Sequence, residues 1–96
     1  MKYTNHALKR LDTRLAKLVS IRDINKAVFS HKIPLGRSYL VVKQIEYTEI
    51  ADETVKPDGI ARGNLIVAVI DNTFDVQITT VLLRKSTSES AEYKYL

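Results

Sequence analysis

The run Leu65-Ile66-Val67-Ala68-Val69-Ile70 decides which fold this chain can form. All six residues are apolar, without the polar alternation of a strand that has one face in water. A strand of this kind is covered on both faces. We therefore expect it to be the central strand of a sheet, buried by helices on one face and partly covered on the other.

Two further strands flank this run. Residues 39–47 are rich in β-branched and aromatic side chains, and residues 74–82 alternate apolar with polar positions. Asp71-Asn72-Thr73 predicts a tight turn that joins the last two strands into an antiparallel hairpin. Residues 49–64 contain a proline and two glycines, and they predict a longer polar loop in which both glycines serve turns.

The chain before the strands has the period of a helix. Leucines recur at intervals of three and four residues, at positions 8, 11, 15 and 18. They predict a helix from Asn5 to about Val19, capped by Thr4 or Asn5. The basic side chains of this segment fall opposite the leucines, which predicts an apolar face and a basic face.

A second helix is expected to begin after Ser20. Ser20 is followed three residues later by Asp23, the spacing of a capping box, with Asp where Glu or Gln is usual. Pro34-Leu35-Gly36 predicts the end of this helix, which leaves His31 at or just past its last turn.

These elements predict an α+β fold of two N-terminal helices packed on a three-stranded antiparallel sheet, in the order helix, helix, strand, strand, strand. Ninety-six residues with 45% apolar content fit one core. We expect residues 1–85 to form a single domain and residues 86–96 a polar tail.

Composition narrows the chemistry. The chain has no cysteine and two histidines, so disulfides and thiolate metal sites are excluded and we expect no metal and no cofactor. No apolar run approaches the roughly 18 residues that span a membrane. A cytoplasmic location and no membrane partner are expected.

The positive charge is concentrated in the first half of the chain. Residues 1–44 carry ten lysines and arginines against two aspartates, a balance of +8, whereas the whole chain has +4. Clustered cations attract polyanions by releasing condensed counterions. The alternative is a solvated basic surface.

His6, Arg10 and His31 are the candidate catalytic residues. Metal-free cleavage of RNA needs a base for the 2′-hydroxyl, an acid for the leaving oxygen and a cation on the phosphorane, and histidine and arginine suit these roles. His6 and Arg10 are four residues apart and project together from a helix. The alternatives are an exposed surface pair for His6 and Arg10, and a helix C-terminal residue favoured by the macrodipole for His31.

Other side chains are candidates for RNA contact. Arg14 and Lys17 extend the basic face of the first helix, and Tyr39 and Tyr47 share a sheet face by parity, where they could stack on a base or pack in the core. Further candidate phosphate contacts lie after the Pro-Leu-Gly stop and at the end of the last strand: Arg37, Arg84 and Lys85.

Three segments in order resemble the RegB family of phage endoribonucleases, and through it the wider RelE-like and colicin-type ribonuclease fold. They are Lys2-Tyr3-Thr4-Asn5-His6-Ala7-Leu8-Lys9-Arg10, Phe29-Ser30-His31-Lys32-Ile33, and Gly63-Asn64-Leu65-Ile66-Val67 ahead of Arg84-Lys85. Small bacterial domains that open with His-Ala-x-x-Arg are similar as well. The resemblance implies metal-independent cleavage of single-stranded RNA, leaving a 2′,3′-cyclic phosphate. It also implies proton transfer by His6 and His31, and phosphate stabilisation by Arg10.

Three hypotheses about function follow. The first is a phage-encoded or toxin-like RNA endonuclease that acts on mRNA, alone or on the ribosome. The second is a non-catalytic module of the same fold that binds RNA, an inhibitor or a host protein. The third is an interaction protein whose acidic segment, residues 46–58, faces a basic partner.

Overall fold

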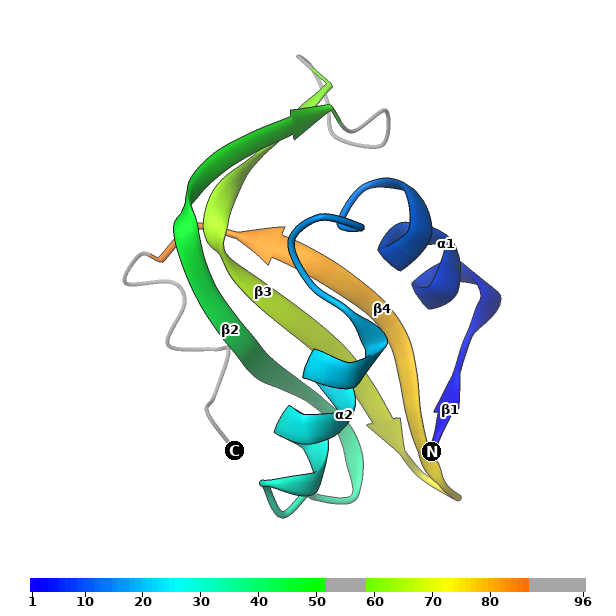
Figure 1. Ribbon diagram of the computed structural model, residues 1–96. Helices are drawn as coiled ribbons and strands as arrows, with labels where there is room; N and C mark the ends of the chain where they lie inside the picture. Colours follow the sequence, from blue (N-terminus) through cyan, green and yellow to red (C-terminus); the bar gives the residue numbers. More distant parts are fainter. Residues whose placement is uncertain (52–58, 87–96) are drawn as a thin grey trace.

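A computed structural model describes residues 1–51 and 59–86 (Figure 1). Two helices cover one face of a four-stranded mixed sheet. The elements are β1 (Lys2–Tyr3), α1 (Asn5–Thr13), α2 (Ile21–Phe29), β2 (Gly36–Ala51), β3 (Ile60–Asn72) and β4 (Val76–Arg84). The α+β class is confirmed, and β3 is a central strand, since the sheet order is β1-β4-β3-β2.

The purely antiparallel sheet and the helix-first order are wrong, because Lys2 and Tyr3 form a strand. They pair in parallel with Gln77 and Ile78 of β4. The Thr4 amide continues the pairing by donating to the Ile78 carbonyl at 3.0 Å. A strand of two residues is too short to carry a periodic signal, and the contact that forms it is distant in sequence.

The first helix is shorter than predicted. It ends at Thr13, and residues 14–18 form a turn in which the Leu18 and Val19 amides both donate to the Leu15 carbonyl. This turn allows Leu15 and Val19 to be buried at 1% and 4% exposure. The apolar spacing therefore continues beyond the end of the helix, because burial in the core, and not helical geometry, determines where Leu15 and Val19 lie.

The second helix matches its prediction. The Ser20 hydroxyl accepts from the Asp23 amide at 3.1 Å, and the Asp23 carboxylate accepts from the Ser20 amide at 3.0 Å, which completes the capping box. The backbone hydrogen bond from Ser20 is the main reason that the pKa of Asp23 lies below its ordinary value. The helix ends at Phe29, two residues before His31.

The β2–β3 hairpin is longer than the sequence indicates. Residues 49–51 and 60–64 belong to its strands, and only residues 52–58 of the predicted loop lie outside the described residues. Register shifts after Val41 and after Gln44 mark β-bulges, which bend a strand. The far end of the hairpin accordingly curves toward the side of the sheet that carries the helices (Figure 1). Gly63 lies in β3 and not in a turn. A Cβ at this position would be 2.4 Å from the Arg84 carbonyl oxygen, so a larger residue does not fit there.

The β3–β4 hairpin turns two residues later than predicted. Asp71 and Asn72 are still strand residues, and residues 73–75 make the turn. Phe74, expected to begin a strand, lies at this turn with its side chain fully exposed.

The two faces of the sheet carry separate apolar clusters. The inner cluster joins both helices to alternate residues of β3, namely Ile66, Ala68 and Ile70. The outer cluster contains Val41, Leu65 and Val67, with Tyr39 and Leu82 packed against it. Within the described ranges, no helix is both long enough and apolar enough to cross a membrane.

Candidate nucleic-acid interface

The start of α1 is fixed to the sheet by Thr4. Its hydroxyl accepts from the Ala7 amide at 3.1 Å, as a helix N-cap, and donates to the Thr79 carbonyl of β4 at 2.7 Å. Ala7 is fully buried beneath the first turn. The first turn of α1 is therefore a rigid platform, from which the side chains after Thr4 project.

His6 and Arg10 form a hydrogen-bonded pair on this platform. The Arg10 Nε donates to His6 Nε2 at 3.2 Å, as the four-residue spacing predicts. His6 is exposed and Arg10 is half-buried. In this arrangement His6 Nε2 is the acceptor of the pair. A phosphate oxygen, which carries charge, would be a stronger acceptor for the guanidinium than the imidazole nitrogen.

Three more cations lie along the same helix or just beyond it. Lys9 is exposed beside His6, Arg14 is the C-cap residue one turn after Arg10, and Lys17 is exposed in the following turn. We call His6, Lys9, Arg10, Arg14 and Lys17 the basic surface. A hydrogen bond joins His6 and Arg10, and Lys17 lies beyond the helix, in the turn of residues 14–18.

His31 is placed elsewhere. Tyr3 and Leu8, which flank His6 in sequence, both lie against the first half of α2: the Tyr3 hydroxyl donates to Asn25 Oδ1 at 2.6 Å, and Leu8 lines a groove with Ile21, the first residue of the helix. From Ile21 the helix runs for nine residues, about 13 Å at the usual helical rise, before the chain reaches His31. The two histidines are therefore at opposite ends of α2, and the structure does not bring them together on one phosphodiester.

The His31 ring has a local partner. Its Nδ1 lies 2.7 Å from the Ala27 carbonyl oxygen in the last turn of α2, and the side chain is half-buried. A ring N–H that donates to this carbonyl satisfies an orphan acceptor at the helix end. Burial of the Tyr3 hydroxyl, which donates to Asn25, raises its pKa to about 12.

Two of the remaining candidates, Arg37 and Arg84, belong to the outer side of the sheet. Arg37 pairs across the strands with Asp71, and its guanidinium carbon is 5.7 Å from the centroid of the Tyr39 ring. Arg84 pairs with Leu65 of the outer cluster and donates to its neighbour's carbonyl, and Lys85 follows it. Arg37 and Arg84 therefore do not join the basic surface, which is on the helical side.

The two tyrosines differ as well. Tyr39 packs against the outer cluster, whereas Tyr47 is 58% exposed. The register shifts between them invalidate the parity that placed both on one face.

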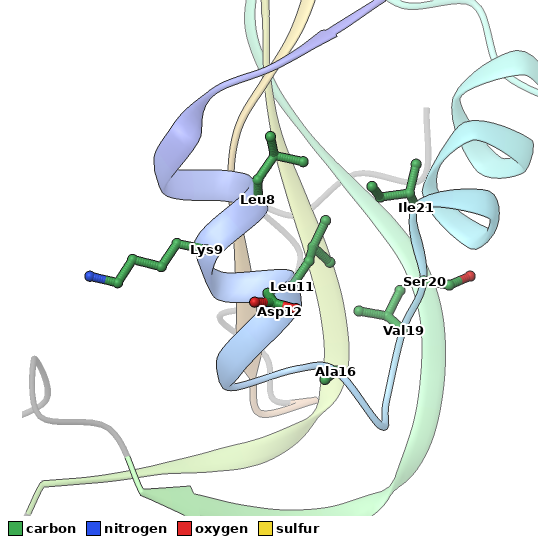
Figure 2. A pocket seen from close by; sticks show the side chains of 8 residues that line it. All are labelled: Leu8, Lys9, Leu11, Asp12, Ala16, Val19, Ser20 and Ile21. Atoms are coloured by element: carbon green, nitrogen blue, oxygen red, sulfur yellow. The ribbon is translucent and has the colours of Figure 1, made fainter.

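An apolar groove beside the basic surface is a feature that the sequence did not predict. It has a volume of about 650 Å³ and lies between α1 and the start of α2 (Figure 2). Leu8 and Ile21, 40% and 42% exposed, face each other across it, with the following residues completing the lining: Lys9, Leu11, Asp12, Ala16, Val19 and Ser20. The leucine period assigned Leu8 to the core. The one indication of this groove in the sequence was Asp12, the only acidic residue among the first 22.

The chain matches no family model, no curated protein and no solved structure in the comparisons made. Across residues 1–51 and 59–86, no three His, Cys, Asp or Glu side chains gather in a way that could hold a metal ion. The fold and the side chains around α1 are therefore the basis for assigning a function.

Proposed function

We propose that this protein binds single-stranded RNA through the basic surface. The observation that carries the proposal is the pair of exposed His6 and half-buried Arg10 on a helix that Thr4 fixes to the sheet, with Arg14 one turn farther on. The excess of positive charge in residues 1–44 supports a polyanionic ligand. The resemblance to RNA-cleaving proteins in the same residues favours RNA over DNA.

The binding chemistry is that of phosphate contacts. Arg10 and Arg14 offer planar forks that match phosphate oxygens, and Lys9 and Lys17 add point charges. An open surface of this kind suits a polymer whose successive phosphates meet successive cations. If four phosphates are neutralised, the logarithm of affinity falls with that of salt concentration with a slope of about −3.

Binding is tested by fluorescence anisotropy with a labelled single-stranded RNA. Arg10→Ala is expected to weaken binding about 5-fold and to reduce the salt slope by about 1. Lys26→Ala on α2 removes the same charge from an exposed helical position away from the basic surface, and it should change affinity less than 2-fold. Equal losses in the two variants, or no binding by the unaltered protein, would contradict the proposal.

A second candidate function is slow, metal-independent cleavage of the bound RNA. It is favoured by one observation: His6 Nε2 accepts a hydrogen bond from a guanidinium, so its lone pair and a cation lie together. If Arg10 turns to a phosphate, Nε2 can take the proton of the 2′-hydroxyl as that oxygen attacks phosphorus. The 5′-oxygen then leaves with a proton from water, since His31 is at the other end of α2, and the product is a 2′,3′-cyclic phosphate.

This candidate is tested on the same RNA by denaturing gel in the presence of EDTA. His6→Ala is expected to lower the cleavage rate at least 100-fold, the usual contribution of one general base, while binding survives. If the unaltered protein leaves the RNA intact, cleavage is excluded and RNA binding stands alone. Cleavage that persists in His6→Ala would point to a contaminating nuclease.

A further inference from the structure

The groove between α1 and α2 combines apolar walls with a polar rim. Leu8 and Ile21 form the walls, and Leu11 and Val19 lie deeper between them (Figure 2). Asp12, one turn after Leu8, brings an exposed carboxylate to the α1 side, and Ser20 is on the α2 side. Exposed leucine and isoleucine on facing elements leave an apolar surface for a ligand to cover.

The groove adjoins the basic surface through Lys9. On a helix, Lys9 lies between the side that carries Leu8 and Asp12 and the side that carries His6. Its side chain extends from the rim away from the groove (Figure 2). A ligand with a flat, largely apolar body joined to a phosphate therefore fits this junction, with the body between Leu8 and Ile21 and the phosphate at Lys9.

We infer that the groove receives one unstacked base of the bound RNA, and that Asp12 selects bases that carry an amino group. The inference rests on the proposed RNA binding and adds a preference to it. A carboxylate accepts hydrogen bonds and cannot donate them, so it pairs with the amino group of cytosine and is repelled by the carbonyl at the same position of uracil. The volume of about 650 Å³ is ample for a base and its sugar.

A base is favoured over an apolar peptide side chain by charge and position. The groove is lined by one carboxylate and lies beside a row of cations, so its ligand should have donor groups next to negative charge. A nucleotide has both within one unit. An apolar side chain of a peptide would contact only Leu8 and Ile21, and its affinity would not depend on Asp12.

The test compares two labelled oligonucleotides, twelve cytidines and twelve uridines, which have the same charge and both lack stable secondary structure at neutral pH. The unaltered protein is expected to bind the cytidine oligomer at least 5-fold more tightly, within the range of a specific base contact. Asp12→Asn should reduce this ratio below 2, because an amide both donates and accepts. Asp75→Asn, on the exposed β3–β4 turn, makes the same charge change and should leave the ratio unaltered.

A second variant tests the walls. Leu8→Ala should weaken both oligomers about 3-fold without changing their ratio, because it removes apolar contact and no hydrogen-bonding group. Salt-sensitive binding with equal affinity for the two oligomers would overturn the base site and leave RNA binding in place. A ratio that survives Asp12→Asn would also overturn it. Failure to bind either oligomer would contradict the proposed function itself.

Discussion

The two helices have the same length and lie in the same layer, but their polar side chains serve different ends. In α2 they hold the structure: Ser20 and Asp23 cap the helix, Asn25 accepts from Tyr3, and His31 binds the backbone of the last turn. In α1, past the Thr4 cap, His6 and Lys9 are exposed, and His6 pairs with the half-buried Arg10. A histidine beside cations therefore has no fixed role, and its nearest partner distinguishes a structural residue from one available to a ligand.

The largest expected difference between the helices is in their apolar residues. Ile24 of α2 is fully buried, whereas Leu8 of α1 is 40% exposed. Ile24→Ala should lower the free energy of unfolding by about 3 kcal/mol, the usual cost of a buried cavity. Leu8→Ala should cost less, about 1 kcal/mol, because two fifths of the Leu8 surface is already in water and no closed cavity is left behind.

Urea unfolding followed by circular dichroism measures both values. The unfolding slope should be the same in the two variants, so that the midpoints report stability directly. If Leu8→Ala is as costly as Ile24→Ala, Leu8 belongs to the core and the groove is not open in solution.

Much of the framework followed from local patterns, and the rest depended on contacts distant in sequence. The capping box at Ser20 and the central position of β3 are encoded in a few adjacent residues. The strand at Lys2–Tyr3 exists only because β4 is there to pair with it. Gly63 resembles a turn residue until the Arg84 backbone is placed against it.

The candidate site shows the same division. The His6–Arg10 pair is a neighbour relation within one helix, and the four-residue spacing predicts it. The separation of His6 from His31 depends on how α1 and α2 are placed, which no spacing encodes. The groove depends on that placement too, since its walls come from both elements.

The next difference concerns the histidines themselves. His31→Ala removes the hydrogen bond to the Ala27 carbonyl and should lower the free energy of unfolding by about 1 kcal/mol. His6→Ala breaks an exposed contact and should change it by less than about 0.5 kcal/mol. RNA affinity of His31→Ala should remain within 2-fold of that of the unaltered protein.

Unfolding and anisotropy measurements on the same two preparations separate the roles. A His31→Ala protein that kept its stability but lost RNA cleavage would contradict the structural role assigned to His31. It would show that α2 presents its histidine to the ligand in solution, and it would restore the two-histidine mechanism that the resemblance implies.

The smallest difference is electrostatic and depends on pH. Asp23 is in the first turn of α2, where its carboxylate accepts from the Ser20 amide and faces the positive end of the helix dipole, while Asp12 is near the C-terminal end of α1. The pKa of Asp23 is lower in the folded protein than its ordinary value of 3.8. The charged form therefore stabilises the fold at pH values above 3.8, and this contribution disappears as the pH falls through the lowered pKa.

Asp23→Asn should accordingly cost a few tenths to about 1 kcal/mol at pH 7, as for other capping residues. The unfolding free energies of Asp23→Asn and the unaltered protein should converge as the pH falls below 3.8. Asp12→Asn makes the same change at the unfavourable end of a helix and should leave stability at pH 7 equal or slightly higher. A loss at pH 7 from Asp12→Asn equal to that from Asp23→Asn would show that the α1 carboxylate is also held by the fold. It would then be a poor candidate for a group that must meet a base.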